Sequence, residues 1–251
     1  MNYIIILVLI FAIAFPIGLA IWWKRKTGEG IWCFVAGAIC FAVFAYGFEG
    51  IMHQLILYGD SAVSSAIQSS PILFMLYASF AAGVFEETGR LFGFKVLLRK
   101  HQERETAVAY GIGHGGIEVI LILGMTYAIY FLALLGVNLG GAETTQQIIS
   151  TANSIPAANA FLAMFERVSA MMMHIGLSMI MFTACRAKGK LWLYPVSIFF
   201  HALADMPACL YQYQVLTSLI AVEAVAFAMG VASLIIGISI IKKCFNQEED
   251  K

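Results

Sequence analysis

The sequence has 251 residues, of which 61% are hydrophobic and 12% are charged, and its mean hydropathy is +0.85. Soluble domains carry about twice that share of charged residues, so a water-soluble globular fold is excluded. Fifteen Lys and Arg balance fifteen Asp and Glu, which leaves no net positive charge to attract nucleic acid. The five cysteines show no CxxC spacing, so neither a disulfide framework nor a thiolate zinc site is indicated.

Seven apolar stretches are each long enough for a membrane-spanning helix, which needs about 20 residues. They run near residues 3–23, 31–57, 72–98, 106–136, 157–184, 191–211 and 216–241. Each is predicted to be helical, because backbone exposed to lipid has to satisfy its own hydrogen bonds. The sequence therefore predicts an all-α, polytopic integral membrane protein of about seven transmembrane helices, with a single transmembrane domain over residues 1–251.

The basic residues of the connecting segments predict the orientation of the chain. Lys and Arg follow alternate stretches, at residues 24–26, 99–104, 186–190 and 242–243. Neither residue type occurs in the other three loops, near 58–71, 137–156 and 212–215. Positive loops stay in the cytoplasm, so the N-terminus is predicted outside and the C-terminus inside a plasma or inner membrane. The first stretch has its positive cluster after it, the reverse of a signal peptide, and is expected to be a retained span.

Ionisable side chains lie inside four consecutive stretches, although a charged group at the centre of a membrane helix costs about 2.5–3.5 kcal/mol. They occur in the runs VFEETGR, YGIGHGGIE, FERVSAMMMH and FFHALADMP. Counted from the cytoplasmic ends at 1.5 Å per residue, Glu86, His114, His174 and His201 are expected at depths of about 12–18 Å. We therefore expect one polar layer, which water reaches from the cytoplasm.

The spacing within each helix favours a converging cluster, because residues three or four apart share a face. The pairs at this spacing are Glu86 and Arg90, Glu87 and Arg90, His114 and Glu118, and His201 and Asp205. Glycines at 111, 113, 115 and 116 surround the histidine of the fourth stretch, and small residues let membrane helices approach closely. A polar site between tightly packed helices is therefore predicted.

The motifs restrict the chemistry of such a site. The zinc motifs HExxH and HxxEH and the serine motif GxSxG are absent. Asp205 is the one aspartate within a predicted helix, whereas an aspartyl protease needs two. A buried glutamate acting as general base on water remains open. So does a zinc ion held by three histidines and a carboxylate.

The polar residues of the third, fourth and sixth stretches resemble three signatures of the CAAX prenyl protease and bacteriocin-processing superfamily of intramembrane endopeptidases. The corresponding residues are Glu86, Glu87 and Arg90, then Tyr110 and His114, then His201 and Asp205. More closely, EETGR, GHGGIE, FERVSAMMMHIGLS and HALADMP are similar to the YhfC family of intramembrane metalloproteases in that group. The resemblance covers residues 45–240 approximately, with a catalytic core at about 72–211.

The resemblance implies roles for the first of these residues. Glu86 would be the general base that activates water, His114 would hold the same water, and Arg90 would pair with a glutamate. Two departures from the signatures are a tyrosine in place of phenylalanine and an arginine four residues after the first glutamate instead of five. Because of this spacing, Glu87 remains an alternative to Glu86 as the base.

The other implied roles concern the oxyanion and the metal. By the resemblance, His201 and Asp205 would bind a metal or steady the tetrahedral oxyanion. Additional candidates from the closer resemblance are Glu118, Glu166 and His174. If Zn²⁺ is bound, the expected ligands are His114, His174 and His201; a metal-free mechanism with glutamate and histidine stays open.

The function implied is that of an intramembrane endopeptidase acting on a membrane-associated peptide or protein. One alternative is a proton- or ion-coupled transporter, in which the intramembrane acids and histidines form a relay. Another is a non-catalytic receptor or scaffold that keeps the polar cluster for packing. Glu49, His53 and Glu223 lie near the outer ends of their helices and are expected outside the site.

Overall fold

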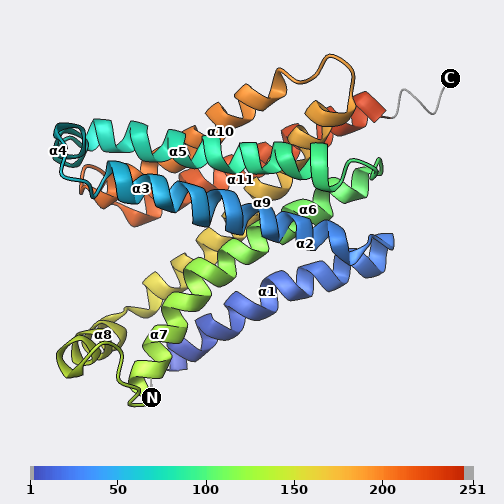
Figure 1. Cartoon of the computed structure of the whole chain (residues 1–251). Helices are drawn as coiled ribbons and strands as arrows, with labels where there is room; N and C mark the ends of the chain where they lie inside the picture. Colours follow the sequence, from blue (N-terminus) through green and yellow to red (C-terminus); the bar gives the residue numbers. More distant parts are fainter. Residues whose placement is uncertain (1–2, 246–251) are drawn as a thin grey trace.

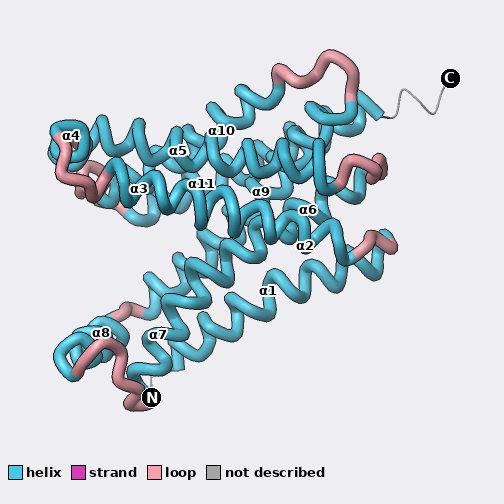
Figure 2. Tube along the Cα trace, viewed as in Figure 1, coloured by secondary structure: helices cyan, strands magenta, loops and turns pink. Residues whose placement is uncertain are grey.

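The structure is a computed structural model that describes residues 3–245, and within this range it contains helices and no strand (Figure 2). Each of the seven predicted stretches is helical, which confirms the all-α class. The long helical segments are α1 (Tyr3–Thr27), α2 (Ile31–Cys40) with η1 (Phe41–Glu49) and α3 (Gly50–Ile56), α5 (Pro71–Phe92) with η2 (Gly93–Leu97), α6 (Arg104–Val119) with η3 (Ile120–Gly124) and α7 (Met125–Leu134), α9 (Ala157–Arg186), α10 (Leu193–Gln212) and α11 (Leu219–Phe245).

Six of these segments are long and apolar enough to cross a membrane. The seventh, Pro71–Leu97, qualifies together with the short helix before it, from which it is bent by 106°. Large apolar side chains are exposed along the outer faces of the helices, among them Ile10, Leu55, Phe161 and Ile235. Such faces suit contact with lipid tails, so the chain is a polytopic membrane protein in contact with the bilayer.

Two predicted loops contain helices that the sequence did not indicate. These are α4 (Ala62–Ser69) and α8 (Ala142–Ser154). Ser61 caps the start of α4 by accepting a hydrogen bond from the Ser64 backbone N–H. Both helices are too short and too polar to give the 20-residue apolar run by which membrane helices are recognised.

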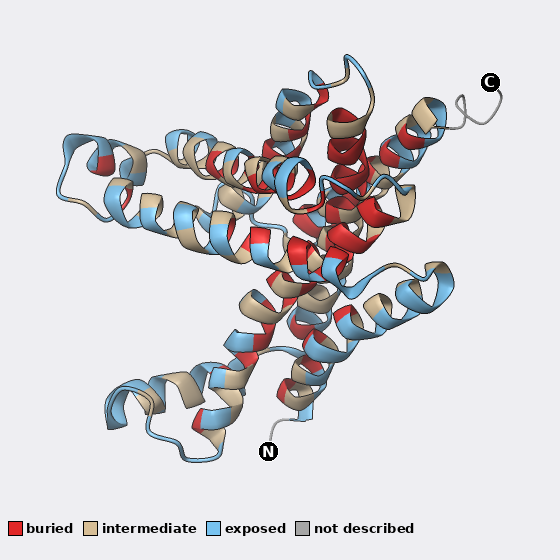
Figure 3. Ribbon diagram, turned by 45° about the vertical axis from the view of Figure 1, so that its right-hand side comes forward, coloured by how far each residue is buried: buried red, intermediate tan, exposed pale blue. Residues whose placement is uncertain are grey.

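The connections sort onto two ends of the helix bundle (Figure 1). The end that carries the Lys- and Arg-containing connections is called here the basic side, and the opposite end, with α4, α8 and the start of α1, the α4–α8 side. In Figure 1 the group of α1 and α7 diverges from the group of α3 and α5 toward the α4–α8 side. Buried residues gather where the helices cross (Figure 3).

Glycines allow the backbones around the polar residues to touch. A Cβ atom on Gly113 of α6 would lie 1.9 Å from the Phe34 carbonyl oxygen of α2. One on Gly111 would lie 2.7 Å from the Cα atom of Ile175 in α9. The predicted close packing of the fourth stretch is confirmed, with α6 held between α2 and α9.

Candidate active site

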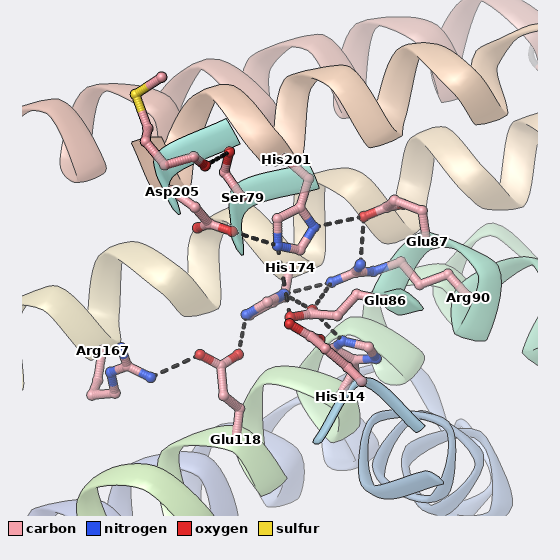
Figure 4. Close-up of polar contacts among 12 residues, drawn as sticks. Ser79, Glu86, Glu87, Arg90, His114, Glu118, Arg167, His174, His201 and Asp205 are labelled. Atoms are coloured by element: carbon pink, nitrogen blue, oxygen red, sulfur yellow. Dashed lines mark hydrogen bonds and ion pairs between the residues drawn. The ribbon is translucent and has the colours of Figure 1, made fainter. Parts of the chain in front are cut away.

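Glu86 of α5 is surrounded by imidazoles from three other helices (Figure 4). Its Oε2 atom lies 2.9 Å from His114 Nε2 of α6 and 3.7 Å from His174 Nδ1 of α9. Its Oε1 atom lies 3.7 Å from His201 Nε2 of α10. The four residues expected in one polar layer therefore meet at a single carboxylate.

Glu87, the next residue of α5, contacts Arg90 of the same helix and His201 of α10. Its Oε1 atom accepts a hydrogen bond from Arg90 at 2.5 Å and lies 3.0 Å from His201 Nδ1. Glu87 and Arg90 are both fully buried. Glu87 therefore balances the guanidinium and fixes one side of the His201 ring.

Arg90 joins α5 to α9. Its second terminal nitrogen lies 2.5 Å from His174 Nδ1 and 3.5 Å from Glu86 Oε2. A planar guanidinium can serve several acceptors at once in a fixed geometry. Arg90 thus connects both glutamates of α5 with the histidine of α9.

The remaining candidates extend the network toward the α4–α8 side. His174 Nε2 contacts Glu118 Oε2, and Glu118 Oε1 lies 2.7 Å from Arg167. Arg167 also contacts Glu166 through its Nε atom. Asp205 Oδ2 lies 3.5 Å from His201 Nε2. The structure brings all nine candidate residues into one connected set, contributed by α5, α6, α9 and α10.

A cavity of about 550 Å³ reaches this network. Glu86, His174 and His201 line its inner part. Its outer lining comes from helix ends on the α4–α8 side, including Asn159, Gln212 and Leu219. The expectation that water enters from the side of the basic loops is therefore wrong. The sequence locates the depth of polar residues but not the end at which the helices separate.

A second cavity, of about 810 Å³, lies on the basic side. Its lining comes from the connection between α9 and α10 and from the end of α11, and it includes Arg186, Lys190 and Lys243. None of the nine candidate residues lines it. This second cavity therefore does not replace the first as a route to the network.

Comparison with known proteins assigns the chain to a family. The model of the YhfC family, described as "YhfC intramembrane metalloprotease", matches residues 11–226. The chain belongs to the YhfC family. It is 32% identical over 243 residues to "Uncharacterized membrane protein YhfC" of Bacillus subtilis (strain 168), with 92% of this chain and 93% of that protein covered. The chain shows no significant match to a solved structure.

In this YhfC-family chain, Glu86, His114 and His174 offer one carboxylate oxygen and two imidazole nitrogens within 4.8 Å of one another. One oxygen and two nitrogens make a donor set that catalytic zinc accepts, with a further position for water. Glu118 at the far nitrogen of His174 is the kind of carboxylate that orients a ligating histidine. The residues present therefore fit a metal. Binding would break the hydrogen bond from Arg90 to His174 Nδ1, because the metal needs the same nitrogen lone pair.

Three residues left outside the site by the sequence line the same cavity, namely Glu49, His53 and Glu223. His53 Nε2 lies 3.2 Å from Glu49 Oε1, and His53 Nδ1 lies 3.0 Å from the Tyr77 hydroxyl. Their position near the outer ends of the helices led to the expectation that they lie outside the site. Because the cavity opens on that side, the same position makes them part of its wall.

Proposed function

We propose that this YhfC-family protein is an intramembrane endopeptidase that hydrolyses a peptide bond of a membrane-associated substrate with a water molecule activated at Glu86. One observation carries the proposal. Glu86 lines the cavity and also contacts histidines of three other helices, whereas Glu87 is fully buried and engaged with Arg90 and His201. This favours Glu86 over Glu87 as the base.

The residues support a complete hydrolytic cycle. Glu86 accepts a proton from water while the water oxygen bonds to the scissile carbonyl carbon. Protonated His201, held through Nδ1 by Glu87, donates from Nε2 to the oxyanion. The C–N bond then breaks, and Glu86 returns its proton to the leaving nitrogen. Asp205, beside His201 Nε2, positions the imidazole.

A zinc ion, when bound, would polarise the carbonyl and lower the pKa of its water. The residues that would hold it are Glu86, through one of its two carboxylate oxygens, and His114 and His174, so that the other Glu86 oxygen would remain as the base. This set shares two histidines with the set predicted from the sequence. His201, whose Nε2 atom lies 3.7 Å from Glu86 Oε1, would remain outside this set and keep its proposed role at the oxyanion.

The test is cleavage of membrane peptides by the full-length protein in proteoliposomes. A quenched fluorescent library of apolar peptides is the probe. Glu86→Gln should lower the cleavage rate by about 10²–10⁴-fold, the usual contribution of a general base. Glu143→Gln, on exposed α8, should leave the rate unchanged.

Cleavage by Glu86→Gln at the wild-type rate would contradict the proposal. An ion flux that disappears in Glu86→Gln, with no peptide cleaved by the wild type, would support a transporter instead.

Zinc analysis of the same preparations decides the role of the metal. About one zinc per wild-type chain, lost in His114→Gln, would support the metal-dependent form, and activity without metal would support the metal-free form.

A further inference from the structure

Glu223 of α11 is a buried acidic group to which the described residues supply neither a hydrogen bond nor an ion pair. Its side chain lines the cavity that reaches Glu86, and the residue is 7% exposed. Its Oε2 atom is buried without a hydrogen bond, and no ion pair joins Glu223 to another residue in the range 3–245. A buried carboxylate without a hydrogen-bond partner is costly, and Arg167, the cation that acts on it, already pairs with Glu118 and Glu166, which points to a ligand outside the chain.

The wall around Glu223 carries an excess of acid. The carboxylates that line the cavity belong to Glu49, Glu86, Glu118, Glu166, Asp205 and Glu223. Arg167 is the one Lys or Arg side chain in this lining, and Glu118 and Glu166 share it. The local charge therefore favours a cationic ligand over a neutral or anionic one.

The packing of α11 against α9 gives the distance of Glu223 from the proposed site of hydrolysis. Both helices run from the α4–α8 side to the basic side (Figure 1). The Ser233 hydroxyl lies 3.3 Å from the Met172 carbonyl oxygen, which sets their register. Glu223, ten residues earlier, is then level with about residue 162 of α9, roughly 18 Å from the level of His174.

An extended peptide rises about 3.3 Å per residue, so about five residues cover that distance. A substrate with its scissile bond at Glu86 would pass Glu223 about five residues away, on its way to the α4–α8 side. Charge-assisted hydrogen bonds are stronger than neutral ones. In a low-dielectric wall they gain further strength.

We propose that Glu223 binds a Lys or Arg side chain of the substrate about five residues from the scissile bond. The assignment of a peptide ligand rests on the proposed function. The preference for a cation rests on the cavity itself and can be measured by binding alone.

The experiment compares two labelled, end-capped apolar peptides that differ in one residue, lysine or acetyl-lysine. Their binding to the full-length protein in nanodiscs is followed by fluorescence anisotropy. We expect the lysine peptide to bind at least about tenfold more tightly, and Glu223→Gln to remove this difference. Glu143→Gln, a carboxylate outside the cavity lining, should keep it. Equal binding of the two peptides to the wild type would overturn the inference.

Two further measurements distinguish cation binding by Glu223 from a purely structural role of its side chain. Glu223→Gln removes no hydrogen bond or ion pair within residues 3–245, so the melting temperature should not fall. A clear fall would show a structural role and overturn the proposal.

In cleaved peptides, mass spectrometry should find the cut about five residues from the lysine. Lysine-selective binding without cleavage would support cation binding by Glu223 and contradict the proposed function. Glu86-dependent cleavage without lysine selectivity would support the proposed function and contradict cation binding by Glu223.

Discussion

Replacing Arg90 by methionine tests the charge balance of the polar network. The guanidinium is fully buried and lies 2.5 Å from Glu87 and 3.5 Å from Glu86. Arg90→Met keeps a side chain of similar length but leaves two buried carboxylates without their cation. Removing one partner of a buried ion pair costs about 3–5 kcal/mol. At about 2–4 °C per kcal/mol, the melting temperature should fall by about 6–20 °C.

A second substitution should recover part of this loss. In the double variant Arg90→Met, Glu87→Gln, one carboxylate and one cation have both been removed, so the net buried charge equals that of the wild type. Coupled neighbours show interaction energies of about 0.5–3 kcal/mol. We therefore expect the double variant to be more stable than the sum of the two single losses predicts, by an amount in that range.

Thermal unfolding in detergent, followed by size-exclusion chromatography with fluorescence detection, measures the stability of the wild type, the two single variants and the double variant. Lys95→Met on the same helical segment is the control, because Lys95 is exposed and, among the described residues, donates only to the Cys185 carbonyl. It should shift stability by less than about 0.5 kcal/mol. A double variant as unstable as the sum of the two single variants would refute the charge argument.

Two further predictions concern packing and access. Gly113→Ala should destabilise the fold by about 2 kcal/mol or more, because its Cβ would lie 1.9 Å from the Phe34 carbonyl oxygen, whereas Gly18→Ala, with nothing within 4 Å, should not. Thermal unfolding checks both. In single-cysteine variants, Cys209, which lines the cavity, and Cys244, near the end of α11, should react with a membrane-impermeant maleimide from opposite sides of the membrane. Labelling of both from one side would contradict the direction in which the cavity opens.

The sequence predicts the helices and the polar layer because both depend on local rules. Apolar length defines the helices, and the rise of 1.5 Å per residue places Glu86, His114 and His174 at one level. Partners across helices are not local. His114 and Glu118 share a face of α6, yet Glu118 contacts His174 and Arg167 instead. These contacts depend on which helices are neighbours and how each is rotated.

The opening of the cavity escaped prediction for a related reason. Basic residues report which loops stay in the cytoplasm, but they do not report where helices diverge. On the basic side the helices are held together by contacts such as Gly111 against α9. The α4–α8 side, where the helices diverge, has no equivalent sequence signal. Glu223 is the one acidic residue of its own stretch, and the cavity wall shows that it lines the same space as Glu166 and Arg167.

The two adjacent glutamates of α5 show how one helix can separate two tasks. Consecutive residues point about 100° apart around a helix, so Glu86 reaches the cavity while Glu87 reaches Arg90 and His201. In the signature that this segment resembles, the arginine stands four residues after the second glutamate; here it stands three after it. Residues three apart and residues four apart both share a helix face, so the arginine still pairs with the second glutamate despite the shift by one residue. The first glutamate is then left at the cavity, where the proposed hydrolysis needs it.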